Sequence, residues 1–299
     1  MKRINPIFKN NMYVKVRSMK LAMLILIYDA VLLFIALFGF EIGLNQNLND
    51  NIDYSTALKV YTLLTCVEVL MVIAIMPSLT AVSISNEREK KTLDILLSTG
   101  IKPRKIIIGK FYEAELTIML YIISALPVLS IVFTIGGIQV ADLVKFLIEI
   151  ITTTVFIGSI GILFSSLCKT TIRAMVSTFV TIFIILFLTV GIAVAAVYIF
   201  GFFEDRLAQG IDISKISYIL IINPVIDILV MVFKQYGNIN IIAEFIEKLG
   251  ITTDMIKYWS LLSVIARLFL SLVFLWLSCR IIDPMKNRKP QKDIIDPED

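Results

Sequence analysis

The chain has 299 residues, of which 58% are hydrophobic and only 17% are charged. Soluble domains carry roughly a quarter of their residues charged, so the apolar excess and the mean hydropathy of +0.88 indicate a lipid environment. The sequence contains no histidine, which excludes imidazole general bases and imidazole ligands for metals or haem. The three cysteines form no C-x-x-C pair and are expected to act as small apolar residues.

Six apolar segments are long enough to cross a membrane as helices, since about 20 residues span the hydrocarbon core. These segments are residues 21–40, 60–84, 111–135, 143–167, 175–200 and 259–282. The runs are continuous, whereas a membrane barrel needs short alternating segments. We therefore expect an all-α integral membrane protein with six spans in one transmembrane domain, residues 1–299.

The basic residues of the loops predict the orientation. The N-terminal arm, the loops 85–110 and 168–174 and the segment after the last span hold twenty Lys and Arg residues together, against seven in the opposite loops. Both termini are therefore expected in the cytoplasm. The net charge of +4 follows from the same loops, and no nucleic-acid partner is expected.

The N-terminal arm predicts a helix that lies flat at the membrane interface. In residues 5–20, apolar side chains recur at three- and four-residue steps and cations fill the other positions. This pattern is typical of a helix with its apolar side in the acyl boundary, and Pro6 supplies a natural start. The alternative is a disordered basic tail.

Residues 218–233 are apolar but short for a span, and they carry Asn223, Pro224 and Asp227 in the middle. A seventh span would also move the C-terminal cations outside. We expect a re-entrant or interfacial hairpin broken at Asn223–Pro224. Residues 201–258 as a whole are expected to form an outward-facing segment of short helices at the membrane face.

The stretch SNEREKKTLDILLSTG, residues 85–100, places a charged helix between two spans. Asn86 with Glu89 three residues later has the shape of a capping box, and Gly100 is placed to end the helix. The leucines that share one face are Leu93, Leu96 and Leu97. We expect one amphipathic cytoplasmic helix within residues 86–100, with about three turns between the cap and Leu97; the alternative is a solvated connector.

Residues 77–111 resemble the signature region of type-2 ATP-binding-cassette (ABC) transporter permeases. The matching positions are Pro77, Glu87-Arg88-Glu89, Thr92-Leu93, Leu96-Leu97-Ser98-Thr99, Ile107 and Gly109-Lys110. Gly100 departs from the pattern, because many relatives have proline there. With the N-terminal arm and the six-span plan, the resemblance extends to most of the chain.

The resemblance implies that residues 86–100 form a coupling helix that docks in a groove of a separate ATPase subunit and moves spans two and three. The implied coupling residues are Glu87, Arg88, Glu89, Thr92, Leu93, Leu96, Leu97 and Gly100. It further implies an exporter in a bacterial cytoplasmic membrane that pairs with a second permease copy or a related permease. ATP–Mg would bind to the ATPase, and no catalytic, cofactor or metal residue is expected in this chain.

Charged residues lie inside several predicted spans: Asp29 in span one, Glu68 in span two, Glu149 in span four and Arg267 in span six. A charge near the bilayer centre costs about 2.5–3.5 kcal/mol on insertion scales, so partners or a water-lined cavity are expected. Two interpretations stay open. The residues form an internal ion pair that fixes packing, or they line a substrate path.

Small residues and prolines inside the spans predict packing seams and kinks. The small residues of span four that allow close helix approach are Gly158, Gly161, Ser165 and Ser166. The kink or hinge candidates are Pro77, Pro127 and Pro224.

Two other function classes are weaker alternatives. An ion-coupled secondary carrier would use Asp29 and Glu68 as titrating groups and predicts internal repeats with paired broken helices, of which the sequence has no convincing example. A membrane-embedded hydrolase would need paired carboxylates with histidine or a serine-based triad, and the absence of histidine argues against it.

Overall fold

The computed structural model describes residues 18–46, 54–98, 102–136, 140–202, 218–236 and 253–282. No β-strand occurs among them, and six helices are long and apolar enough to cross a membrane. These six stretches are Met19–Ile42, Lys59–Glu89, Pro103–Ile131, Val140–Leu167, Thr171–Ala195 and Tyr258–Ile281. The prediction of an all-α protein with six spans is therefore confirmed.

Five of the spans belong to single long helices, and the fifth in chain order is a rod of three consecutive pieces. The single helices are α2 (Met19–Gln46), α3 (Tyr54–Glu89), α5 (Pro103–Gly136), α6 (Val140–Leu167) and α12 (Thr253–Ile281). The rod consists of α7 (Thr171–Phe183), the π-helical turn η1 (Ile184–Leu188) and α8 (Thr189–Phe202). The short elements are α4 (Thr92–Ser98), the 3-10 helix η2 (Tyr218–Ile222) and α10 (Pro224–Tyr236).

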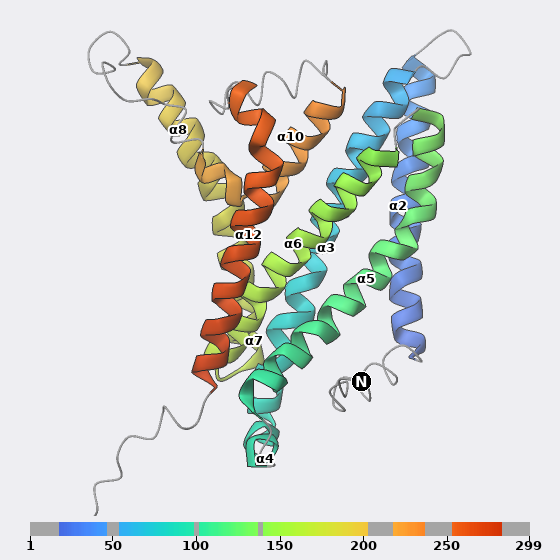
Figure 1. The fold of residues 1–299 in the computed structure, drawn as a ribbon. Coiled ribbons are helices and arrows are strands. Elements are labelled where there is room, and N and C mark those ends of the chain that lie inside the picture. The colour runs from blue at the N-terminus through green and yellow to red at the C-terminus, as the bar shows by residue number, and fades with distance from the viewer. Residues whose placement is uncertain are drawn as a thin grey trace, which may run out of the picture.

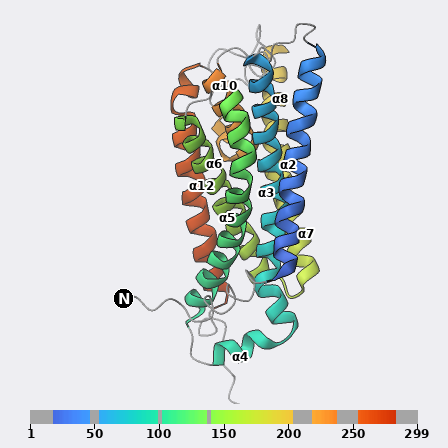
Figure 2. The same cartoon turned by 90° about the vertical axis from the view of Figure 1, so that its right-hand side faces the viewer.

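Helices α3 and α6 form the centre of the bundle. Helices α2 and α5 pack against α3 and α12 packs against α6, so that α2 and α12 lie on opposite sides (Figures 1 and 2). In α6, 72% of the most apolar stretch is buried inside the protein, whereas the share is 17% in α12. The large apolar side chains that the outer helices expose, such as Phe34 and Phe269, fit contact with lipid.

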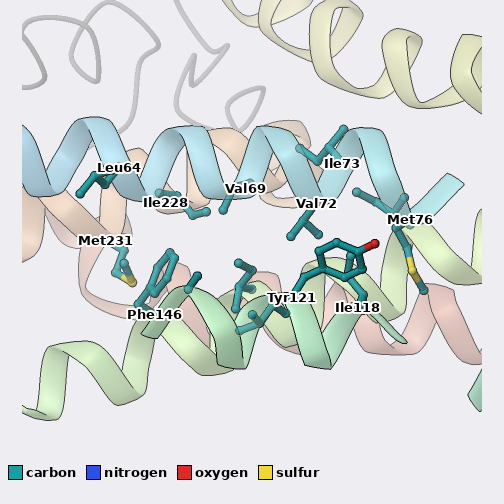
Figure 3. Packing of buried hydrophobic residues seen from close by; sticks show 14 of the residues in the cluster. Leu64, Val69, Val72, Ile73, Met76, Ile118, Tyr121, Phe146, Ile228 and Met231 are labelled. Atoms are coloured by element: carbon teal, nitrogen blue, oxygen red, sulfur yellow. The ribbon is translucent and has the colours of Figure 1, made fainter. Parts of the chain in front are cut away.

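The core between the helices is apolar and includes part of the segment 201–258. Figure 3 shows Leu64 and Val72 of α3 beside Tyr121 of α5 and Phe146 of α6. Ile228 of α10 belongs to the same cluster and is 1% exposed. Helix α10 is therefore built into the bundle.

The segment 201–258 differs in part from its prediction. Within its described part, the chain breaks at Asn223–Pro224 between η2 and α10, as the sequence predicts. Helix α10 packs against α3, α6 and α12 and runs toward the end of the bundle opposite α4 (Figure 1). It thus inserts among the spans and does not lie flat on their ends. Residues 203–217 and 237–252 lie outside the described residues.

Asn223 fixes this break through both ends of its side-chain amide. Its Oδ1 accepts hydrogen bonds from the backbone N–H groups of Val225 (3.0 Å) and Ile226 (3.4 Å), which caps α10. Its Nδ2 donates to the Leu186 carbonyl and the Thr189 hydroxyl, both at 2.9 Å. Leu186 lies in the π-helical turn η1. Such turns are rare in proteins, and those that occur are often found at functional sites. Here the turn is the place where the rod bonds to Asn223.

Small residues of α6 bring it into close contact with α3, as the sequence predicts. A Cβ atom at Gly161 would lie 1.9 Å from Thr80 Oγ1 and 3.3 Å from the backbone nitrogen of Ala81. A Cβ atom at Gly158 would lie 2.3 Å from the terminal methyl of Met76. A larger residue at Gly161 would therefore push the two central helices apart, whereas at Gly158 the flexible end of Met76 would have to move aside.

Ser165 continues this seam with hydrogen bonds. Its Oγ accepts from the backbone N–H groups of Ile84 and Ser85 on α3, each at 2.9 Å. Ser166 instead donates to the Ile162 carbonyl of its own helix at 2.8 Å. Ser165 thus adds two buried hydrogen bonds between α6 and α3.

The charged loop differs from its prediction of one helix over residues 86–100. Helix α3 continues to Glu89, the chain turns over the next two residues, and α4 begins at Thr92. The prediction that Asn86 caps a helix is wrong, because Asn86 lies inside α3 and its carbonyl accepts a hydrogen bond from the Lys90 N–H at 3.0 Å. The charged residues therefore end one helix and do not begin another.

The turn itself depends on Lys91, whose φ of 59° lies in the left-handed region. This conformation is usual for glycine at the C-terminal end of a helix and uncommon for lysine. Helix α4 then ends at Ser98. Gly100, predicted as the helix stop, lies outside the described residues.

The three prolines predicted as kinks occupy different kinds of position. Pro77 and Pro127 lie inside α3 and α5, which continue past them, and α5 changes direction along its length (Figure 1). Pro224 is the first residue of α10, where its fixed φ suits a helix start. Their use as hinges stays a prediction. The flat helix expected over residues 5–20 falls mostly outside the described residues, which begin at Ser18.

Candidate functional site

Three consecutive charged residues at the end of α3 each bind a different part of the bundle. We call Glu87, Arg88 and Glu89 the Glu-Arg-Glu bracket. Glu87 forms an ion pair with Lys110 of α5, with Oε1 and Nζ 2.7 Å apart. A cavity of about 290 Å³ opens beside this pair between α3 and α5, lined mostly by polar side chains. The first bracket residue thus ties span two to span three.

The other two bracket residues satisfy backbone groups where α6 ends and α7 begins, groups that have no partner within a helix. Arg88 Nη1 donates to the carbonyl of Cys168, just after α6, at 2.9 Å. Glu89 Oε2 accepts from the backbone N–H of Thr171 at 3.0 Å and from its hydroxyl, whereas Thr170 at the N-cap makes no side-chain capping bond. A cation at a helix C-terminus and an anion at a helix N-terminus are both favourable for the helix dipoles.

Helix α4 turns leucines toward the bundle. Leu93 is 4% exposed and packs with Ile107 of α5 and Ile162 of α6 in an apolar cluster at this end of the protein. Leu97 packs against the same cluster. The leucine face predicted from the sequence is real, but Leu93 contacts the protein's own spans and has no surface left for a partner.

The side of α4 that faces away from the bundle carries Ile95, which is 66% exposed. Sequence analysis did not single out this residue, although its position two residues after Leu93 places it on the other side of a helix. Leu96 is half-buried. The Thr92 hydroxyl donates to the Glu87 carbonyl at 3.1 Å, which fastens α4 to the end of α3.

Arg267 of α12 lies at the centre of a buried polar cluster. Its Nη2 contacts both Glu149 of α6 and Asp227 of α10, and its Nη1 donates to the Thr153 hydroxyl at 2.9 Å. The Ser263 hydroxyl donates to Asp227. The cluster joins three helices, and it brings together Arg267 and Glu149 from the predicted set.

Asp29 and Glu68, the other two predicted residues, do not contact Arg267. Asp29 accepts a hydrogen bond from the Ser124 hydroxyl of α5 at 3.0 Å. Glu68 is 0% exposed, and neither of its carboxyl oxygens has a hydrogen-bond partner among the described residues. Their role in a substrate path stays a prediction.

Sequence analysis missed two buried acids. Asp227 was evident only as an interruption of an apolar run, and its pairing with Arg267 requires the insertion of α10. Glu115 of α5 is 6% exposed and accepts a hydrogen bond from the Thr154 hydroxyl of α6 at 3.0 Å. Its signal was its position four residues inside predicted span three, where a charge is costly.

Comparison with known proteins places these features in a family. A family model described as ABC-2 family transporter protein matches residues 42–280. The matched range includes the bracket, α4 and the Arg267 cluster. No curated protein matches the chain.

Proposed function

The chain belongs to the ABC-2 family of transporter proteins, as a multi-pass membrane permease, and we propose that it serves an exporter driven by a separate ATPase. The observation that carries this proposal is the rigid attachment of α4, a short helix beyond the spans that exposes Ile95. The family match does not favour an ion-coupled carrier that would use Asp29 and Glu68 without an ATPase.

The side of α4 that faces away from the bundle suits an apolar groove with an acidic rim on the ATPase. Ile95 supplies an exposed apolar anchor. Exposed basic residues flank α4 in the sequence: Lys90 and Lys91 before it, and Lys102 and Arg104 after it. A central apolar anchor with charged residues around it is the usual composition of a specific interface.

The attachments of α4 define how a push from the ATPase would reach the spans. Leu93 and Leu97 join α4 to the apolar cluster at this end of the bundle. The bracket adds polar connections to α5 through Lys110, to the end of α6 through the Cys168 carbonyl, and to the start of α7 through Thr171. Motion of α4 would therefore act on spans three, four and five as well as span two.

The complete transporter would contain two permease chains and two ATPase chains, with ATP–Mg bound by the ATPases. In a bacterial cytoplasmic membrane, α4 and both termini would face the cytoplasm. The twenty basic residues of the loops on that side support this orientation. The start of α2 and the end of α12 also lie at the end of the bundle that carries α4 (Figure 1).

Co-purification tests the docking of α4. The tagged permease would be co-expressed with each ABC ATPase of its own genome, as wild type, Ile95→Asp and Ile95→Leu. A charge in place of a buried anchor costs about 2 kcal/mol or more, so Ile95→Asp should retain at least about tenfold less ATPase. Ile95→Leu, the matched control, should retain it.

Two outcomes would count against the proposal. Full retention of the ATPase by an Ile95→Asp variant that inserts normally would remove α4 as the docking element. Solute export by the permease alone in liposomes, without any ATPase or ATP, would remove the proposed function itself.

A further inference from the structure

The buried cluster around Arg267 has one cation and two acids. Arg267 and Asp227 are 0% exposed and Glu149 is 2% exposed. Both carboxylates contact the same guanidinium nitrogen, Nη2, so the two acids also lie next to each other. If both were ionised, one negative charge would be in excess inside an apolar core, which is strongly unfavourable.

The polar neighbours do not compensate this excess. The Thr153 hydroxyl accepts from Arg267 and donates to the backbone carbonyl of Glu149, not to its carboxylate. The Ser263 hydroxyl donates to Oδ2 of Asp227. The other oxygen, Oδ1, is buried with no hydrogen-bond partner among the described residues. An ionised carboxylate is acceptor-only, and leaving one of its oxygens bare in the core is costly.

The surrounding helices bury no second cation among the side chains that the structure describes. The buried titratable side chains on α3 and α5 are Tyr61, Glu68, Glu115 and Tyr121. Helix α7 and η2 bury only apolar side chains and Thr178 in their described parts. Among the residues whose side-chain burial the structure describes, which leaves out 233–236 of α10 and 253–257 of α12, Arg267 is the one buried basic residue. No group of three metal-ligating side chains occurs among the described residues.

We propose that Glu149 and Asp227 bind one proton between them, which makes the cluster neutral and holds α10 against α6 and α12. One carboxyl oxygen carries the proton and donates it to the other acid, while the remaining negative charge pairs with Arg267. Loss of the proton restores the excess charge. The attachment of α10 is therefore complete when the pair is protonated and weakens as the pH rises through its titration.

Infrared difference spectroscopy of the permease in lipid nanodiscs tests the shared proton. Spectra of Glu149→Gln and Asp227→Asn would be compared with wild type in the region of protonated carboxyl groups. Each single variant should lose the same one band, because the acid that remains is ionised against Arg267. The double variant should lose no more than either. Thr153→Val, the matched control, removes a bond to Arg267 but no acid and should keep the band intensity.

Retention of the full band by either single variant would overturn the proposal. A second measurement uses the wild type alone, in case a variant fails to assemble. The hydrogen-exchange protection of residues 224–232 should fall with rising pH relative to residues 158–165 of the α3–α6 seam. Equal responses of the two segments would also overturn it. So would protection that follows the sodium or magnesium concentration and not the pH, since a metal cation would then occupy the site.

Discussion

At the scale of single residues, side-chain hydrogen bonds determine where α3 ends and α4 begins. The turn contains neither glycine nor proline. Arg88 and Glu89 hold the last turn of α3 to the α6–α7 junction, and the Thr92 hydroxyl binds the Glu87 carbonyl. Lys91, which lies between these bonds in the sequence, adopts the left-handed conformation. This conformation costs an L-residue about 1–2 kcal/mol of conformational free energy.

Substitution of Lys91 should reveal this cost. Lys91→Gly removes the clash of Cβ and should raise the stability by up to about 1 kcal/mol. Lys91→Val should lower it by more than about 1 kcal/mol, because a β-branched residue tolerates this region poorly. The midpoint of thermal unfolding in detergent measures both. The same changes at Lys90 are the control, and a Lys91→Gly variant no more stable than Lys90→Gly would contradict the account.

The sequence identifies individual charged residues more readily than their partners. The family resemblance implies that the bracket residues couple to the ATPase, yet all three bind groups within the chain itself. Arg267 was recognised as needing an acid, but Asp227 is 40 residues away and Glu149 is 118 residues away in the chain. Such pairings depend on how separate helices dock, and local pattern does not contain that information.

At the scale of elements, the six spans could be predicted because length and hydropathy are local properties. The end of α3 could not, since Lys90 and Lys91 are ordinary helix formers and the only glycine signal was Gly100. The insertion of α10 was also beyond the sequence: its break at Asn223–Pro224 is a local signal, whereas its burial against α3, α6 and α12 is tertiary. The close packing of α6 through its small residues could be predicted, but its partner helix α3 could not.

The seam predicts a sharp difference between two glycines. Gly161→Ala would place a methyl group against Thr80 and the α3 backbone, whereas a Cβ atom at Gly191 of α8 meets nothing within 4 Å. Overpacking of this kind costs about 1–3 kcal/mol, so Gly161→Ala should lower the thermal midpoint and Gly191→Ala should not. Size-exclusion profiles after heating would measure both. Equal tolerance of the two alanines would show that α3 and α6 are not closely packed.

At the scale of the whole molecule, the contacts form a continuous path between the two ends. The apolar cluster around Leu93 joins α4 to α5 and α6, and the bracket joins the adjacent end of α3 to α5, to the end of α6 and to α7. The seam joins α6 to α3 along the centre, and α10 packs on both of these helices at the other end. A displacement of α4 by the proposed ATPase would therefore reach the outward-facing segment through α3 and α6.

Because docking and transmission use different residues, a variant can keep the docking of the ATPase and lose the transmission of its motion. Arg88→Met keeps Ile95 exposed on α4 but removes the bond to the Cys168 carbonyl. A hydrogen bond from a charged group contributes about 1.5–3 kcal/mol, so coupling should weaken about tenfold or more. We expect the ATPase to co-purify normally while its stimulation by the permease in liposomes is lost. Arg173→Met removes an exposed arginine near the start of α7, outside the proposed docking surface, and serves as the control. Normal stimulation by Arg88→Met would mean that the bond to the Cys168 carbonyl does not transmit the motion of α4.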